Sequence, residues 1–352
     1  MSFPRRVSLT LTNFCNLRCR MCGQWSENGY IRRSGAEVAP MPLSEWKRLV
    51  DEMAGNGVTW VLIRGGEPFL YPGIIELLEY LQSKGLRTSV DTNASMLKQY
   101  AADLVRLGDV HITISVDGPE PIHDAVRGVK GSFRRIADGL AALREFERSS
   151  GKYVDRSICF TISRYSLAGL GDMPDVARRL GVPTILIAPY YYFSEAVGKQ
   201  YEAELRELGC DGYTWRGFQH EDSGVDIDEF LRQLRRFRQS LGSVSLYPFM
   251  DFNEDQYRTW FTDPSTPVGS TECWSIDGLV DIQPNGDANF CVDFPDYSIG
   301  NVKESTIAEL WNGERAARFR EARRKKPLAV CHRCGAKFMC AKRDSDRRVI
   351  WE

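Results

Sequence analysis

Residues 10–24, TLTNFCNLRCRMCGQ, place three cysteines at the spacing Cys15-x3-Cys19-x2-Cys22, directly after an apolar strand candidate at residues 7–12. A four-iron cubane normally takes four thiolates, so three thiolates on one short loop would leave one iron open to another ligand. The alternative interpretation is a zinc site, although zinc sites usually pair their cysteines as CxxC. The spacing therefore favours an iron–sulfur centre with an open coordination position.

Composition limits the classes of function open to the chain. Its 352 residues include 46 Lys+Arg and 47 Asp+Glu, a near balance that gives no basic field for nucleic acid. No apolar run approaches the roughly 20 residues of a membrane span, and MSFPRRV leads into a strand without a signal-peptide core. We therefore expect a cytoplasmic protein with no nucleic-acid or membrane partner, in which most of the ten cysteines are metal ligands rather than disulfides.

Short apolar runs alternate with amphipathic helix candidates over the first half of the chain. Strands followed by helices predict parallel pairing with right-handed crossovers. Six such units are too few for an eight-unit barrel and predict an α/β fold, an open partial (β/α)6 TIM-like barrel. The expected strands are 7–12, 60–64, 87–91, 110–116, 157–162 and 184–188, and the expected helices are 44–54, 73–83, 96–107, 133–147 and 170–180.

Unusual segments follow the ends of these strands, where barrels of this type place their function. The run Gly65-Gly66-Glu67-Pro68 ends the second strand, and glycine lets a ligand approach the backbone closely. A tight turn is the ordinary alternative for this run.

Polar side chains end the third, fourth and fifth strands. Ser115 and Asp117 point to one face and could bind ribose hydroxyls, and Asn93 could do similar work one strand earlier. Each of the three could instead be a turn or cap former. Arg127 and Ser163 are weaker candidates for binding the same ligand. For Arg127 the ordinary alternative is a solvated surface charge.

A second cysteine group lies near the C-terminal end. Its pattern is Cys273-x17-Cys291 followed by Cys331-x2-Cys334-x5-Cys340. Asn-Gly at 285–286 predicts a β-hairpin that brings Cys291 back toward Cys273. A helix expected at residues 305–324 then returns the chain to the CxxC. Two thiolates from the hairpin and two from the CxxC would complete a four-thiolate site, and the spacing alone allows zinc as well as iron–sulfur.

The three N-terminal cysteines, GGEP at 65–68 and ISVDGPEPIHDAVRG at 114–128 resemble the radical S-adenosylmethionine (SAM) superfamily. The resemblance implies that SAM chelates the open iron of a first [4Fe–4S] cluster and that Glu67 lies close to its amine. The C-terminal pattern resembles the SPASM/twitch extension, which implies one auxiliary [4Fe–4S] cluster held by Cys273, Cys291, Cys331 and Cys334. Asp344 stands where a further cysteine would be expected. Cys340 is then an alternate ligand or a possible hydrogen donor.

The resemblance also divides the chain and implies its chemistry. We expect the barrel core at 1–190, an unassigned helical and aromatic linking region at 191–272 with helices at 195–208 and 226–241, and the cluster domain at 273–352. The expected activity is reductive cleavage of SAM to a 5′-deoxyadenosyl radical that abstracts a hydrogen atom from substrate, with an electron donor such as flavodoxin or ferredoxin.

Several classes of substrate fit this chemistry. We expect first the oxidation or epimerisation of a carbohydrate or aminocyclitol in natural-product biosynthesis. The alternatives are epimerisation, crosslinking or cyclisation of a ribosomally made peptide, and a non-catalytic zinc-binding protein. Tyr190, Tyr191 and Tyr192 follow the sixth strand and could line a substrate pocket or simply pack at the barrel mouth.

Overall fold

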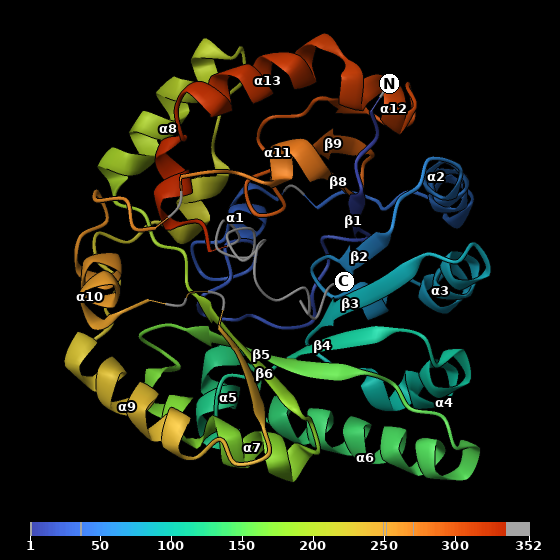
Figure 1. Ribbon diagram of the computed structural model, residues 1–352, viewed down its shortest axis with the longest axis vertical. Coiled ribbons are helices and arrows are strands. Elements are labelled where there is room, and N and C mark those ends of the chain that lie inside the picture. The colour runs from blue at the N-terminus through green and yellow to red at the C-terminus, as the bar shows by residue number, and fades with distance from the viewer. Residues whose placement is uncertain (1, 36, 249, 251, 270, 336–352) are drawn as a thin grey trace.

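One sheet runs through the molecule. The computed structural model describes residues 2–335 except 36, 249, 251 and 270. Within them ten strands follow the order β10-β9-β8-β1-β2-β3-β4-β5-β6-β7 (Figure 1). Neighbours from β8 to β7 are parallel, whereas β8 with β9 and β9 with β10 are antiparallel.

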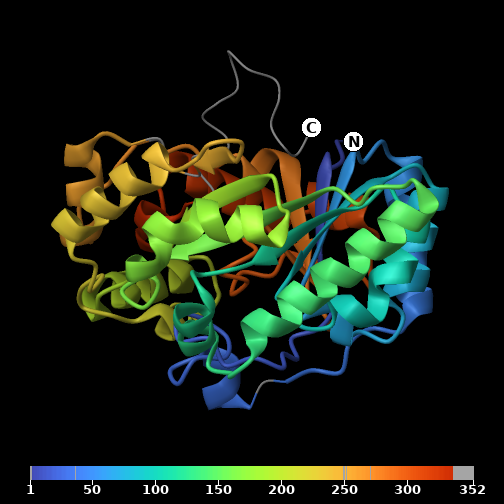
Figure 2. The ribbon, with the colours of Figure 1, turned by 90° about the horizontal axis from the view of Figure 1, so that it is seen from below.

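The six strands predicted from the sequence are present, and helices cover their outer face (Figures 1 and 2). The partial barrel is therefore confirmed. The strands are β1 Arg6–Thr10, β2 Trp60–Arg64, β3 Arg87–Thr92, β4 His111–Ser115, β5 Arg156–Ile162 and β6 Thr184–Pro189; the helices are α2 Leu43–Gly55, α3 Ile74–Ser83, α4 Leu97–Leu107, α6 Ser132–Ser150 and α7 Met173–Leu180.

Short strands from later in the chain extend this sheet at both ends. Strand β7 (Ser245–Pro248) pairs with β6, and β8 (Leu279–Ile282) pairs with β1. The predicted hairpin is present as β8 and β9 (Asp287–Asn289), and β10 is Gly300–Asn301. A sheet limited to six strands was thus too small, because two- to four-residue strands leave no periodic signal of their own.

The helices expected in the middle and C-terminal regions are found with some changes. Helices α8 (Glu195–Glu207) and α9 (Ile227–Gln239) are confirmed. The single helix expected near 305–324 is two, α12 (Ile307–Asn312) and α13 (Glu314–Lys325), which meet at Gly313. The helix expected at 170–180 begins only at Met173, after a 3₁₀ segment. The sequence missed α1 Tyr30–Ser34, α5 Glu120–Arg127, α10 Glu254–Thr262, α11 Ser275–Gly278, and the 3₁₀ helices η1 Pro68–Leu70, η2 Leu167–Asp172, η3 Thr214–Phe218 and η4 Ala329–Arg333.

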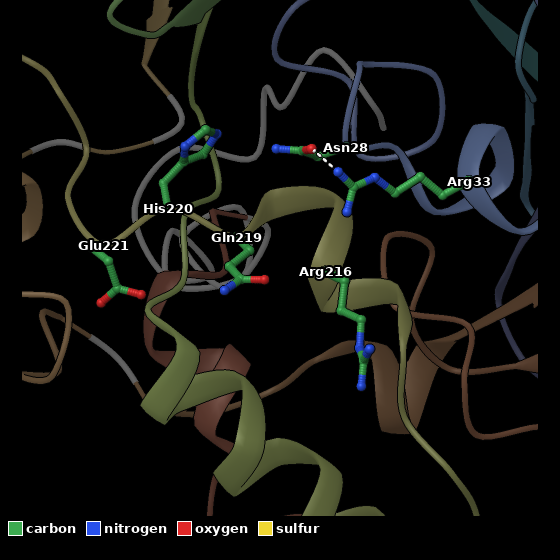
Figure 3. A pocket seen from close by; sticks show the side chains of 6 residues that line it. All are labelled: Asn28, Arg33, Arg216, Gln219, His220 and Glu221. Carbon is green, nitrogen blue, oxygen red and sulfur yellow. Dashed lines mark hydrogen bonds between the residues drawn. The ribbon is translucent and has the colours of Figure 1, made fainter.

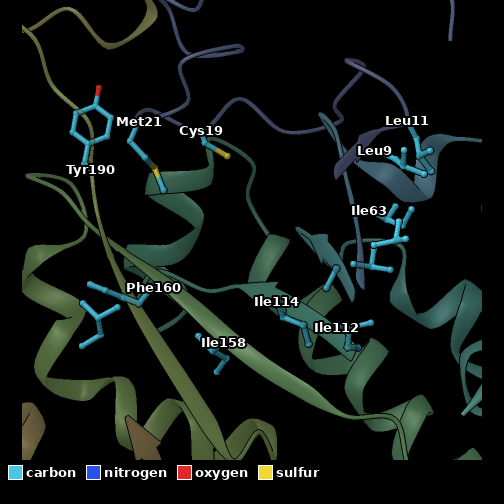
Figure 4. Packing of buried hydrophobic residues seen from close by; sticks show 14 of the residues in the cluster. Leu9, Leu11, Cys19, Met21, Ile63, Ile112, Ile114, Ile158, Phe160 and Tyr190 are labelled. Carbon is cyan, nitrogen blue, oxygen red and sulfur yellow. The ribbon is translucent and has the colours of Figure 1, made fainter. Parts of the chain in front are cut away.

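The two faces of the barrel strands differ in polarity. Leu9, Ile63 and Ile112 are fully buried in the apolar core between strands and helices (Figure 4). Ser8 and Thr10 alternate with the apolar residues of β1 and are also buried. Side chains alternate across a strand, so these polar groups lie on the opposite, inner face. The inside of the barrel is therefore suited to a polar ligand. None of the helices in the described part of the chain is long and apolar enough to traverse a bilayer.

Candidate functional site

The N-terminal cysteine loop leaves the carboxyl end of β1 and is tied to the end of α5. The amide of Arg20 donates to the carbonyl of Val126 at 2.9 Å. Backbone amides also reach two of the sulfurs: Leu17 N lies 3.5 Å from Cys15 Sγ and Trp25 N lies 3.3 Å from Cys22 Sγ. These bonds fix the loop so that its sulfurs are held by backbone as well as by side-chain packing.

Burial dominates the chemistry of these thiols. It raises the pKa of Cys15 to about 12 and that of Cys19 to about 11, against an ordinary 9.0. Iron and other metals bind the thiolate, so metal binding must supply the positive charge that keeps such buried sulfurs ionised. Without a metal these buried thiols would therefore be protonated, and ligation to iron would release their protons.

Arg127 supplies one positive charge beside this loop. Its Nη1 lies 3.6 Å from Cys19 Sγ, and its Nε lies 2.6 Å from Asp117 Oδ2. Both side chains of this ion pair are buried, so the alternative of a solvated surface charge does not hold for Arg127. The amide of Thr161 donates to Asp117 Oδ1 at 3.2 Å. The Asp117 carboxylate therefore contacts both Arg127 and the β5 backbone. Because Arg127 also contacts Cys19, the ion pair links Asp117 to the cysteine loop.

Gly65 and Gly66 serve the cysteine loop directly. A Cβ atom on Gly66 would clash with the carbonyl oxygen of Phe14, and one on Gly65 would clash with the carbonyl oxygen of Thr12. The Gly66 amide donates to that Thr12 oxygen at 2.7 Å, and Glu67 N donates to Phe14 O at 2.8 Å. Absence of side chains thus lets the end of β2 lie against the loop that carries the cysteines.

Glu67 is fully buried beneath this contact. Its carboxylate accepts from Thr92 Oγ1 at 2.7 Å, Asn93 N at 2.8 Å and Phe69 N at 3.1 Å. Burial outweighs these bonds and raises the pKa of Glu67 to about 7. Pro68 begins η1 directly after it. Glu67 therefore joins the ends of β2 and β3 below the cysteine loop.

The end of β3 is strained where it meets the loop. Ala94 has φ 54°, and no other non-glycine residue of the described chain has a positive φ. Asn93 Nδ2 donates to Asn16 Oδ1 at 2.9 Å, which links this turn to the segment between Cys15 and Cys19. Left-handed backbone of this kind is costly for alanine and tends to occur at functional sites.

Two more predicted residues lie at the ends of β4 and β5. Ser115 pairs with Cys159 across these strands and is half-buried. Ser163 is fully buried, and its hydroxyl lies 3.0 Å from Ser166 Oγ within the loop after β5. The structure thus gathers the predicted cofactor residues along one rim, from β2 to β5, around the three cysteines.

The second cysteine group surrounds one cavity. Cys273, Cys291, Cys331 and Cys334 all line it, together with aromatic side chains such as Phe290 and Phe294. Across residues 2–335, the undescribed positions aside, no three Cys, His, Asp or Glu side chains stand close enough to hold a single metal ion. Four thiols spread around an apolar cavity suit the separate corners of a cubane. Cys340 lies outside the described residues.

A polar bridge connects the barrel to this cavity, and the sequence did not reveal it. Asp293, two residues after Cys291, accepts from Arg64 Nη2 at 3.3 Å and from the hydroxyl of Tyr191 at 3.1 Å. Arg64 ends β2 and Tyr191 follows β6, so the bridge depends on tertiary contacts. Tyr190 and Tyr192, the neighbours of Tyr191 in sequence, are buried in the hydrophobic core.

A polar pocket opens beside the N-terminal cysteine loop (Figure 3). It is lined by residues from two distant segments, 28–33 and 216–221. These segments are held together because Gly217 packs directly on the backbone of Gly23 and Phe218 packs over it. We call this the rim pocket, and its lining residues are Asn28, Arg33, Arg216, Gln219, His220 and Glu221.

Comparison with known proteins matches both cysteine regions. Residues 9–158 match the model of the Radical SAM superfamily, and residues 273–335 match SPASM, an iron-sulfur cluster-binding domain. An AdoMet-dependent heme synthase of Methanosarcina barkeri is 25% identical, covering 96% of this chain and 90% of its own. The subtilosin biosynthesis protein AlbA of Bacillus subtilis is 23% identical and covers 88% of this chain and 60% of its own.

Solved structures agree on the fold. SuiB of Streptococcus suis has a TM-score of 0.64 at 16% identity, covering 91% of this chain and 68% of its own. SuiB bound to S-adenosylmethionine gives 0.61 over 94% of this chain and 68% of its own. The family matches, the buried three-thiol loop and the four-thiol cavity together give the cofactors as SAM and two [4Fe–4S] clusters. This chain therefore belongs to the radical SAM superfamily and carries a SPASM-type iron–sulfur domain near its C-terminal end.

Proposed function

We propose that this radical SAM enzyme modifies a ribosomally made peptide by removing a hydrogen atom from one of its residues. When bound, the first cluster and SAM supply a 5′-deoxyadenosyl radical, which can take hydrogen from an unactivated C–H bond. The protein's own task is to bind the peptide, present one residue to the barrel and exclude water.

The relatives support a peptide over the carbohydrate or aminocyclitol expected first from the sequence. AlbA is named for bacteriocin biosynthesis, and SkfB of Bacillus subtilis, 24% identical, is named for maturation of a sporulation killing factor. A PqqA peptide cyclase of Gluconobacter oxydans is 26% identical, covering 88% of this chain and 76% of its own. The family matches also speak against a non-catalytic zinc protein.

The rim pocket is the observation that carries the proposal. Pockets for small molecules usually enclose most of the ligand's surface. The rim pocket is instead open and adjacent to the cysteine loop, and all six of its lining side chains are polar or charged, although Arg216 already pairs with Glu202. An extended peptide has repeating amides that such groups can bind, and its chain can continue out of the site. Residues beside the reacting one would lie in this pocket.

The remaining roles follow from position. We propose that Cys15, Cys19 and Cys22 hold the first cluster. SAM would lie along the ends of the barrel strands, against residues 65–68, Asn93 and Ser115. Asp117 and Arg127 would hold Cys19 in place, and Ser163 would shape the adjoining loop. Cys273, Cys291, Cys331 and Cys334 would hold the auxiliary cluster.

Formation of an iron porphyrin is the second candidate, and one observation favours it. Two relatives from Methanosarcina barkeri, an Fe-coproporphyrin III synthase and an AdoMet-dependent heme synthase, span 93% and 96% of this chain. A porphyrin carboxylate could pair with Arg33 in the rim pocket, whereas Arg216 already pairs with Glu202 at 2.9 Å.

One experiment separates the two candidates. The reconstituted enzyme is incubated anaerobically with SAM, dithionite and short peptides encoded beside its gene, and in parallel with iron coproporphyrin. A peptide that loses two hydrogens, or gains one deuterium in deuterated water, supports the proposal. The variant Arg33→Ala removes one cation from the rim pocket. It should weaken peptide binding while SAM cleavage without peptide continues. Unchanged peptides together with a converted porphyrin would overturn it.

A further inference from the structure

Helix α13 separates the auxiliary cavity from the surface. Phe319 and Arg323 on its inner side line the cavity that holds the four C-terminal cysteines. Phe319 also stacks on Phe290, with ring centroids 5.4 Å apart at 15°. Figure 1 shows the helix on the outside of the molecule, beside α8 and α12. A helix is about 10 Å thick, so its outer face lies about that far from the cavity.

The outer face of α13 is positively charged. Residues 314–326 contain seven Arg or Lys and only Glu314 and Glu321 as acids, although the whole chain has a net charge of −1. The exposed bases are Arg315, Arg318, Arg324, Lys325 and Lys326.

Acidic groups from other elements reduce this charge without cancelling it. Asp277 pairs with Arg324, and Glu204 of α8 pairs with Lys326 at 3.2 Å. Arg323 lines the cavity and does not belong to this face, so six bases stand against Glu314, Glu321, Asp277 and Glu204 and leave an excess of two positive charges. Arg318 binds only the backbone oxygen of Glu207 among its described contacts.

The same face is hollowed. A shallow pocket lies over α13 and is lined by Ala317, Arg320, Glu321, Arg324 and Lys325. Arg320 is itself held in place, since its guanidinium lies 4.1 Å from the ring centroid of Trp311 and donates to the Ile276 carbonyl at 2.7 Å. The hollow is therefore built from fixed as well as flexible cations, and a protruding acidic surface would fit it.

We propose that the outer face of α13 docks a small acidic electron-carrier protein of the ferredoxin or flavodoxin class, which delivers one electron to the auxiliary cluster. The carrier is oxidised by one electron and the auxiliary cluster is reduced by one; no bond forms or breaks and no proton moves. Opposite charges steer such encounters and raise the association rate, an effect that salt screens. The proposal does not depend on the identity of the substrate.

The test is the double charge reversal Arg318→Glu with Lys325→Glu. Its matched control is Arg135→Glu with Arg148→Glu on α6, which makes the same charge change on two exposed arginines across the molecule. Reduced plant-type ferredoxin is mixed anaerobically with each reconstituted enzyme without substrate, and its oxidation is followed by stopped flow. Iron content and circular dichroism confirm that each variant is folded and loaded.

We expect the α13 variant to lose about tenfold or more in second-order rate at low salt, and the difference to shrink at high salt. The α6 control should keep the normal rate. Equal losses in both variants, or no loss in either, would overturn the docking site.

A second variant locates the point of electron entry. Enzyme with Cys15, Cys19 and Cys22 all changed to Ala should still oxidise the carrier at the normal rate and show the spectrum of a reduced auxiliary cluster. If that variant no longer oxidises the carrier, electrons enter through the first cluster and the proposal fails. Peptide turnover is not measured in either experiment, so failure here is distinct from failure of the proposed function.

Discussion

Arg127 and Asp117 form a buried ion pair, with Nε of the arginine 2.6 Å from Oδ2 of the aspartate. The arginine also reaches Cys19 Sγ at 3.6 Å. One side chain thus links the end of β4 to the cysteine loop. Because both partners are withdrawn from water, each depends on the other for compensation of its charge.

Arg127→Met should therefore destabilise the protein by about 3–5 kcal/mol, since it leaves the Asp117 carboxylate buried without its cation. Adding Asp117→Asn should recover part of that loss. The control is Arg134→Met, which breaks an exposed pair with Glu120 and should cost under about 1 kcal/mol. Denaturant unfolding followed by circular dichroism measures all three. A loss in Arg127→Met no larger than in the control would contradict the assigned role.

The packing of Gly66 gives a second prediction. Gly66→Ala should push the cysteine loop away from β2, because the added methyl group would clash with the Phe14 carbonyl oxygen. Bound iron should fall by about half, from about eight to about four per chain, because only the first cluster is affected.

The matched control is Gly55→Ala at the end of α2, where a Cβ meets no atom within 4 Å. Iron and sulfide analysis after anaerobic reconstitution gives the comparison. Full iron content in Gly66→Ala would show that the loop tolerates the methyl group.

The parts of the fold that could be predicted are those with local signals. Alternating apolar strands and amphipathic helices gave β1 to β6, and Asn-Gly at 285–286 gave the β8–β9 hairpin. Strands β7 and β8 could not be predicted as members of the barrel sheet. Each has four residues, and each is held by a parallel partner far away in sequence, β6 and β1 respectively.

The candidate site shows the same division. Cysteine spacing identified both metal-binding regions, because ligand number and spacing are local properties. Arg127 looked like a surface charge because its partners, Asp117 and Cys19, lie on other elements. Asp293 carried no motif at all. Its role is visible only once the sheet brings Arg64 and Tyr191 to it.

The two cysteine groups should separate SAM cleavage from auxiliary chemistry. Changing Cys15, Cys19 and Cys22 to Ala should remove 5′-deoxyadenosine formation with dithionite while about four irons remain. Changing Cys273 and Cys291 to Ala should also leave about four irons but keep SAM cleavage without substrate. Chromatography of 5′-deoxyadenosine and iron analysis test both. Undiminished cleavage in the first variant would contradict the assignment, as would zinc in place of iron at the second site.

His123 makes stability depend on pH. It is almost fully buried on α5, where its Nδ1 accepts from the Asp117 amide at 3.2 Å. Burial, and then the positive charge of Arg127, lowers the pKa of His123 from its ordinary 6.5 to about 3. The folded protein therefore keeps this ring neutral. Below pH 6.5 the unfolded chain takes up a proton that the folded chain does not, and the stability that this neutral ring contributes is lost progressively down to about pH 3.

Acidification from about pH 7.5 to about pH 5.5 should lower the free energy of unfolding by about 1.4 kcal/mol through His123 alone. This is the free energy that corresponds to one pKa unit. His123→Gln removes the titrating group and keeps an oxygen that can accept from the Asp117 amide. Other ionisable groups titrate alike in both proteins, so the difference between their pH slopes isolates His123. Denaturant unfolding of the reconstituted enzymes at the two pH values measures it. The variant should be less stable near neutral pH and should lose less stability on acidification; parallel slopes would mean that His123 ionises equally in the folded and unfolded chains.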